Sequence, residues 1–240
     1  MALSRRDFVK LCSGTVAGFG VSQMFHPAIH EAFAQTLTGE RPPVFWVQGQ
    51  GCTGCSVTLL NSTHPSIADV LLKIISLEFH PTVMAAEGEG AYEHMMRVAE
   101  KFKGKFIFAV EGAVPVAHDG KCCVVAEAGH HEVTMTEVTK VLAANAAAVL
   151  AVGTCAAYGG IPAGKGNETG AMGVAAFLKK EGIPAPVINI PGCPPHPDWI
   201  VGTIGLGLQA LATNTLGLLV KQGLDANGRP KAFYKNVHMN

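Results

Sequence analysis

Five short apolar runs, rich in β-branched and aromatic residues, alternate with helix-like stretches along the chain. They cover Val44–Gln48, Ile75–His80, Phe106–Val110, Ala148–Val152 and Val187–Ile190. Runs of this length are typical of buried strands, and helices between them allow neighbouring strands to lie parallel. The alternation therefore predicts an α/β fold, specifically a flavodoxin-like doubly wound parallel sheet.

Local signals place further elements between these runs. Helices are expected near Cys55, from Ser66 to Ile74 with Ser66 as the N-cap, and from about Pro197 onward. Three more are expected over 90–102, 134–144 and 171–180. Asp119-Gly120 is typical of a hairpin turn and predicts Cys122–Val125 as one arm of that hairpin.

Four cysteines follow three of the five predicted strands. Cys52 and Cys55 form a C-T-G-C pair after the first strand, Cys155 follows the fourth and Cys193 follows the fifth. Loops at the carboxyl ends of parallel strands face one crevice, so three distant segments would bring four thiolates together. Four thiolates are the ligands that a 4Fe-4S cluster needs.

The residues around the cysteines suit a bulky inorganic group. Glycines at 51, 54, 153 and 192 allow close backbone approach, and Pro194 stiffens the loop after Cys193. Backbone N–H groups at helix starts can donate to cluster sulfides. Glu89 follows the second strand at the same sheet edge, where it could sit beside a cluster or simply interact with a helix N-terminus.

Three other interpretations of the cysteines remain open. Zinc sites favour two closely spaced pairs, whereas this chain has one pair and two isolated cysteines. Two disulfides are plausible in an exported protein. A thiol-disulfide exchange site at Cys52 and Cys55 would resemble the thioredoxin arrangement but leaves Cys155 and Cys193 unexplained. The adjacent Cys122 and Cys123 are expected to be structural.

The N-terminus has the pattern of an export signal. Ser4-Arg5-Arg6-Asp7-Phe8-Val9-Lys10 matches a twin-arginine leader, and Ala32-Phe33-Ala34 offers a cleavage site. We therefore expect a twin-arginine signal peptide over 1–34 and a location in the periplasm or on the extracytoplasmic face of the membrane. The formal net charge is zero, which gives no reason to expect nucleic acid as a partner.

The strings GCTGC, GTCAAYGG and GCPPHP closely resemble the small subunit of periplasmic nickel-iron hydrogenases, especially the nickel-iron-selenium branch. The resemblance covers essentially the whole chain and includes SLEFHPTVMAAEGE and FAVEGAVP. The proximal-cluster subunit of respiratory complex I is a related alternative. It has adjacent cysteines where this chain has C-x-x-C, so the spacing favours hydrogenase.

The resemblance implies roles for particular residues and partners. Cys52, Cys55, Cys155 and Cys193 would bind one proximal 4Fe-4S cluster, and Glu89 would match a glutamate near it. A separate large subunit would hold the nickel-iron site, and no residue of this chain would be catalytic. This chain would carry electrons during reversible oxidation of dihydrogen, to or from a carrier such as a cytochrome c. Gly54 departs from the oxygen-tolerant pattern, so an ordinary cubane is expected.

The same resemblance suggests a domain organisation. A flavodoxin-like domain with the proximal cluster site is expected over 35–215, and a C-terminal extension, truncated relative to the family, over 216–240. His238 would match a distal-cluster histidine, but the next cysteine of the family pattern would fall at residue 241. Medial and distal clusters are therefore not expected from this sequence. An exported thiol-disulfide protein and a non-catalytic truncated remnant stay as alternatives.

Overall fold

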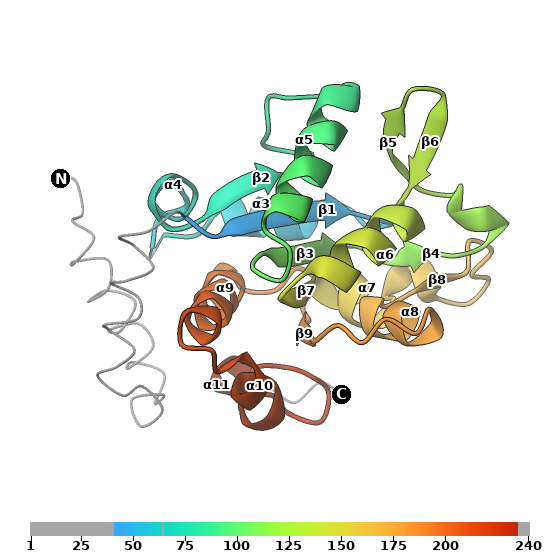
Figure 1. The fold of residues 1–240 in the computed structure, drawn as a ribbon. Helices are drawn as coiled ribbons and strands as arrows, with labels where there is room; N and C mark the ends of the chain where they lie inside the picture. Colours follow the sequence, from blue (N-terminus) through green and yellow to red (C-terminus); the bar gives the residue numbers. More distant parts are fainter. Residues whose placement is uncertain (1–40, 64, 235–240) are drawn as a thin grey trace.

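A five-stranded parallel sheet forms the centre of the computed structural model, which describes residues 41–63 and 65–234 (Figure 1). The strands are β1 (Pro43–Gln48), β2 (Ser76–Phe79), β3 (Ile107–Glu111), β7 (Ala148–Val152) and β9 (Val187–Ile190). Their order across the sheet is β2-β1-β3-β7-β9, with every neighbouring pair parallel. This is the flavodoxin-like order, so the predicted fold class and all five predicted strands are confirmed.

Helices cover both faces of this sheet because the strands are apolar on both sides. In β1, Phe45 and Val47 point to one face, whereas Val44 and Trp46 point to the other. The first face is covered by α5 (Gly88–Lys101), α6 (Met135–Asn145), α7 (Gly153–Tyr158) and α8 (Val174–Lys180). The second face is covered by α3 (Gly54–Leu60), the helical segment α4 (Ile67–Asp69) with Val70–Ile74, and α9 (Pro197–Ala212).

Two small antiparallel sheets lie beside the main one. They are β4 (Val114–Pro115) with β8 (Ala171–Met172), and β5 (Val124–Ala128) with β6 (His131–Thr134). The prediction of a hairpin turn at Asp119-Gly120 is wrong, because that dipeptide lies in a short 3-10 turn and the hairpin reverses at Gly129-His130. Residues 171–172, predicted as the start of a helix, pair with β4 instead.

The predicted signal peptide over 1–34 lies outside the described residues, as does His238. Residues 216–234 form α10 (Leu216–Leu218), a π-helical turn over Leu219–Gly223 and α11 (Lys231–Tyr234). Leu224 and Tyr234 from this segment are buried in the same apolar cluster as α9. Among the described residues, no helix combines the length and apolarity needed to span a membrane.

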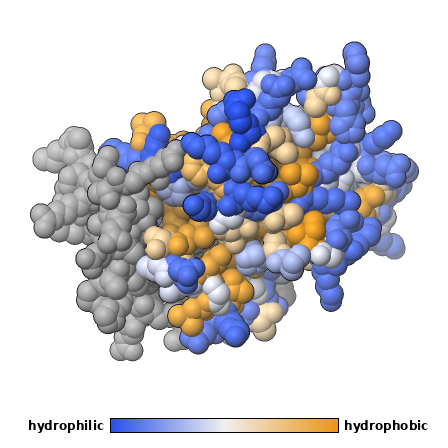
Figure 2. Space-filling view, viewed as in Figure 1, coloured by the Kyte–Doolittle hydropathy of each residue, from blue (hydrophilic) through white to orange (hydrophobic). Residues whose placement is uncertain are grey.

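The hydropathy of the surface in Figure 2 differs from one element to another. Hydrophilic residues dominate over α5 and the β5–β6 hairpin, whereas hydrophobic residues gather over α9 and α10 at the lower left. Leu218 of α10 is about half exposed, with 52% of its surface accessible. The polar character of α5 agrees with its single buried stripe of Ala91, Met95 and Ala99.

A capping box fixes the start of α6 and provides a stability test. The Thr134 side chain accepts a hydrogen bond from the Glu137 backbone N–H, and the Glu137 carboxylate accepts one from the Thr134 N–H. We expect Thr134→Ala to lower the free energy of unfolding by about 1 kcal/mol. Thr134→Ser keeps the acceptor and should cost much less in a urea titration. Equal losses in both variants would contradict the capping role.

Candidate functional site: four thiols at the carboxyl edge of the sheet

Three cysteine-bearing loops meet where the parallel strands end. Cys52 and Cys55 follow β1, with Cys55 in the first turn of α3. Cys155 lies in α7, which begins directly after β7, and Cys193 lies in the loop after β9. The carboxyl end of β3 lies between those of β1 and β7, and β9 lies beside β7 at the edge of the sheet.

Burial and neighbouring charges oppose the ionisation of two of the four thiols. Burial raises the pKa of the Cys55 thiol strongly, and the charges of Glu111, Cys52, Cys155 and Cys193 raise it further. Burial also raises the pKa of Cys155, and Cys193 and Cys52 add to that effect. Thiols that oppose one another's ionisation require a positively charged partner before all can be thiolates together.

Close backbone contacts hold the cysteine loops against each other. A β-carbon on Gly153, where φ is +87°, would collide with the Cys55 sulfur. The Thr154 N–H donates to the Gly192 carbonyl at 2.9 Å, and the Gly192 N–H approaches the Thr154 hydroxyl at 3.1 Å. Thr154 and Gly192, which precede Cys155 and Cys193, are therefore each both donor and acceptor in hydrogen bonds with the other.

The surroundings of Cys155 combine a donor with a close glycine. The Ile161 backbone N–H donates to this thiol and favours its ionised form, partly offsetting burial. A β-carbon on Gly160 would lie 2.7 Å from the Cys155 sulfur, so glycine keeps that space free. Within residues 41–63 and 65–234, no three His, Cys, Asp or Glu side chains are close enough to bind a single metal ion.

Glu111, at the end of β3, is the central buried carboxylate of this site. One oxygen accepts the backbone N–H groups of Cys55 at 2.9 Å and Ser56 at 3.2 Å. The other accepts the Ser56 hydroxyl, the Trp46 indole N–H at 3.0 Å and the Gln48 amide at 3.1 Å. Glu111 is only 2% exposed, so these donors replace its hydration. We did not predict Glu111 from the sequence, although a single charge ending an apolar strand is the signal that could have identified it.

His80 extends this network away from the cysteines. The Thr82 N–H donates to His80 Nδ1 at 3.2 Å, which leaves the ring proton on Nε2, 3.3 Å from the Ser56 hydroxyl. The ring is 1% exposed and stacks on Trp46 with centroids 5.2 Å apart. Burial lowers the pKa of His80 to about 4, against an opposing effect of the Glu111 charge.

The remaining candidates lie in other environments. Glu89 is exposed, and its carboxylate accepts the Gly129 N–H at 2.8 Å, which joins the start of α5 to the β5–β6 hairpin. Its predicted influence on a cluster stays a prediction. Burial raises the pKa of Cys123, and its neighbour Cys122 adds to the effect. His196 is a hydrogen-bonding residue, because its Nδ1 accepts the Asp198 N–H at the start of α9.

The buried, neutral His80 predicts an acid-dependent loss of stability. Below about pH 6.5 His80 binds a proton in the unfolded chain, whereas in the folded chain it stays neutral down to about pH 4. The free energy of unfolding should therefore fall between these values, by up to about 1.4 kcal/mol per pH unit. His80→Gln should flatten this slope in urea titrations across that range. His130→Gln, at an exposed hairpin position, should keep the wild-type slope. A parallel pH dependence in all three proteins would exclude His80 as the cause.

Comparisons with known proteins give a consistent result. The family model described as NADH ubiquinone oxidoreductase, 20 Kd subunit, matches residues 52–206, a range that includes all four cysteines. The periplasmic NiFeSe hydrogenase small subunit of Desulfomicrobium baculatum is 53% identical over 100% of this chain and 77% of its own length. The hydrogenase-2 small chain of Escherichia coli K12 is 38% identical over 84% of this chain, which spans only 51% of that protein.

A solved structure gives the same result at the level of the fold. The recombinant NiFeSe hydrogenase from Desulfovibrio vulgaris Hildenborough matches with a TM-score of 0.79 and 68% sequence identity. The match covers 82% of this chain and 71% of the other. With a family model over more than half of its residues and a relative 53% identical along its full length, the chain belongs to the family of nickel-iron hydrogenase small subunits.

Proposed function

We propose that Cys52, Cys55, Cys155 and Cys193 hold one 4Fe-4S cluster, through which this chain transfers electrons in a hydrogenase. The observation that carries the proposal is the convergence of three cysteine loops after β1, β7 and β9, where neighbouring thiols add to the raised pKa of Cys55 and of Cys155. Iron provides the positive charge that such a set needs, and glycines at 153 and 160 leave room next to two of the sulfurs. When bound, the cluster would supply one-electron redox chemistry.

The protein's own residues would tune that chemistry. The Ile161 N–H donates to Cys155, and hydrogen bonds to ligand sulfur stabilise the more negative, reduced form. The buried Glu111 carboxylate acts in the opposite direction, because its negative charge disfavours added electrons nearby. Glu111 also accepts the backbone N–H of Cys55, which fixes the orientation of the first turn of α3.

Exposed apolar side chains near the thiols support docking of a larger subunit over this edge. Ile161 is 84% exposed, Val57 54% and Tyr158 45%. Ile161 and Tyr158 follow Cys155 closely in the chain, and Val57 follows Cys55. The relatives are named hydrogenase small subunits or small chains. We infer that a large subunit holds the hydrogen-activating centre and covers these residues.

The location follows from the relatives together with the leader sequence. The Desulfomicrobium baculatum relative is named periplasmic, and Ser4–Lys10 of this chain has the twin-arginine pattern. We infer export in the folded state by the twin-arginine route, and electron exchange with a periplasmic carrier such as a cytochrome c.

A thiol-disulfide role for Cys52 and Cys55 is less well supported. Exchange needs only the Cys52–Cys55 pair. The charges of Cys155 and Cys193 also act on Cys55, so the site holds two further thiols for which exchange gives no role. That environment suits a cysteine whose thiolate is stabilised by a bound metal centre.

Iron content tests the proposed cluster. We expect about four iron and four acid-labile sulfide per chain in protein purified anaerobically from its own host. Cys193→Ser should lose most of both, because it removes one ligand. Cys122→Ser, also at an exposed cysteine, should retain both. A wild-type protein without iron, or equal loss in the two variants, would overturn the assignment.

The reduction potential tests the role of Glu111. Glu111→Gln removes a buried negative charge, so the cluster potential should rise in an EPR-monitored titration. The same variant should also lower the free energy of unfolding. The glutamine amide N–H₂ would face N–H donors that hydrogen-bond to a carboxylate oxygen in the wild-type protein. Glu89→Gln is the matched comparison. A shift in Glu89→Gln alone would assign the electrostatic role to Glu89 rather than Glu111.

A further inference from the structure

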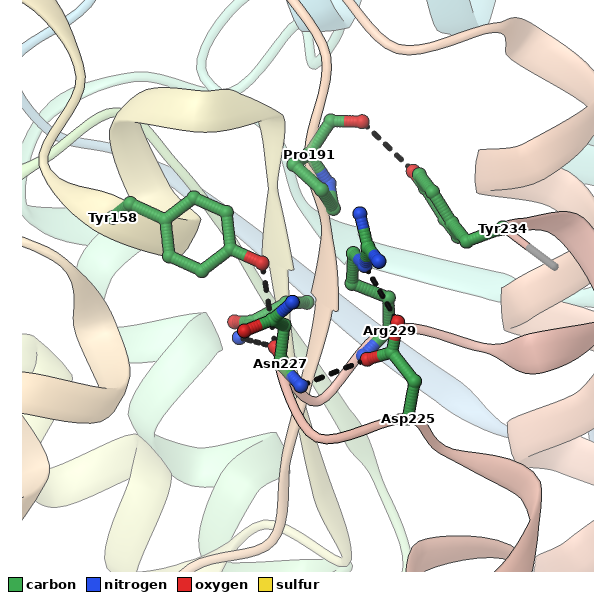
Figure 3. A network of polar contacts seen from close by, with 7 residues as sticks. Tyr158, Pro191, Asp225, Asn227, Arg229 and Tyr234 are labelled. Atoms are coloured by element: carbon green, nitrogen blue, oxygen red, sulfur yellow. Dashed lines mark hydrogen bonds and ion pairs between the residues drawn. The ribbon is translucent and has the colours of Figure 1, made fainter. Parts of the chain in front are cut away.

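A tight turn over Asp225–Arg229 packs against the edge of the sheet at β9 (Figure 3). One carboxylate oxygen of Asp225 accepts the backbone N–H groups of Asn227 and Arg229, each at 2.9 Å. The other accepts the Arg229 Nε–H at 2.7 Å. Gly228, at φ +72°, completes the turn with its N–H on the Asp225 carbonyl. The turn is therefore closed by its own side chains.

This turn is bonded to both β9 and α7. The Asn227 carbonyl accepts the Asn189 side-chain amide at 2.7 Å and the Tyr158 hydroxyl at 3.3 Å. The Asn189 backbone N–H donates to the Gly228 carbonyl at 2.8 Å, so the turn also occupies the free edge of β9. Tyr158 lies three residues after Cys155. One end of the Cys155 helix is thereby attached to the turn.

Tyr234 makes the equivalent connection to the Cys193 loop. Its hydroxyl donates to the Pro191 carbonyl at 2.8 Å, two residues before Cys193 (Figure 3). The Tyr234 ring is 3% exposed, packs against Trp199 at 4.7 Å and lies under the Arg229 guanidinium at 5.4 Å. Arg229 therefore links Tyr234 to Asp225 in one contact network.

The charges in this network are shielded from solvent. The side chains of Arg229 and Asp225 are 12% and 23% exposed. Burial raises the pKa of Asp225, but hydrogen bonds from the Arg229 and Asn227 backbones and from the Arg229 guanidinium outweigh it, so the pKa lies below its usual value. The Asp225–Arg229 pair remains ionised at neutral pH and holds Arg229 over Tyr234.

We propose that Asp225–Arg229 and Tyr234 form a clasp that sets the spacing of Cys155 and Cys193, with Tyr234 as a positioning residue for the cluster. Thr154 and Gly192 already join the two loops immediately before each cysteine. The clasp restrains the same loops from the outside, through residues near each cysteine in the chain. The loops that carry Cys155 and Cys193 are therefore restrained by two sets of contacts, which preorganises their thiols for binding. Preorganisation of this kind slows the loss of a bound group. The inference rests on the proposed cluster.

The three tyrosines of the chain provide a complete test set. Tyr234→Phe removes the hydroxyl bond to Pro191 while keeping both ring contacts, and Tyr158→Phe removes the longer bond to Asn227. Tyr92→Phe, on α5 and far from the clasp in the fold, is the control (Figure 1). Each protein is purified anaerobically as the hydrogenase complex. Iron release to bathophenanthroline disulfonate is then timed, and the EPR spectrum of the reduced cluster is recorded.

We expect Tyr234→Phe to contain wild-type iron but to release it about three- to tenfold faster, the scale of one lost buried hydrogen bond. Its EPR signal should broaden, whereas Tyr158→Phe should change less and Tyr92→Phe not at all. Release at the Tyr92→Phe rate, with an unchanged spectrum, would overturn the clasp.

Wild-type protein without iron would instead overturn the proposed cluster. In that case, the rate of iodoacetamide labelling at Cys193, measured by peptide mass spectrometry, still tests the clasp. Faster labelling in Tyr234→Phe than in Tyr92→Phe would support restraint of the Cys193 loop, and equal rates would refute it. Asp225→Asn weakens the ion pair that holds Arg229, so it should act in the same direction as Tyr234→Phe. That result would show that the effect belongs to the whole network.

Discussion

The Glu111 carboxylate is the interaction on which the cysteine edge of the sheet depends. A buried carboxylate is costly unless every lone pair finds a donor, and Glu111 obtains donors from β1 and from α3. The first turn of α3 has no side-chain N-cap, because Thr53 makes no capping hydrogen bond. Glu111 takes over that role from a neighbouring strand. The same contact therefore begins the helix and fixes Cys55.

The fold itself could be predicted from local patterns. The strands β1, β3 and β7 are apolar runs buried on both faces, and the helix-like stretches in the chain allow parallel pairing of such runs. Parallel strands place their carboxyl ends on one edge, so the meeting of Cys52, Cys55, Cys155 and Cys193 followed from the order of elements. The prediction of the fold succeeded because it needed periodicity and topology alone.

The features that escaped prediction all depend on tertiary partners. Asp119-Gly120 has the composition of a hairpin turn, but the strand before it pairs with residues 171–172. From the local sequence, Glu111 is only the last residue of a strand. Its role depends on hydrogen-bond donors that lie 55 to 65 positions earlier in the chain. Tyr234 carries no local signal either, because its partner Pro191 is 43 residues away. A single sequence does not reveal such pairings.

The three cysteine loops also have a consequence for the chain as a polymer. Cys55 and Cys155 are separated by about 100 residues, and β8, α8 and β9 lie between Cys155 and Cys193. A group bound to all four sulfurs would act as a cross-link that closes several long loops at once. By the chain-entropy argument, a single link across about 100 residues restricts the unfolded state by about 5 kcal/mol. Cluster insertion would thus determine not only whether the protein is redox active but also how readily it unfolds.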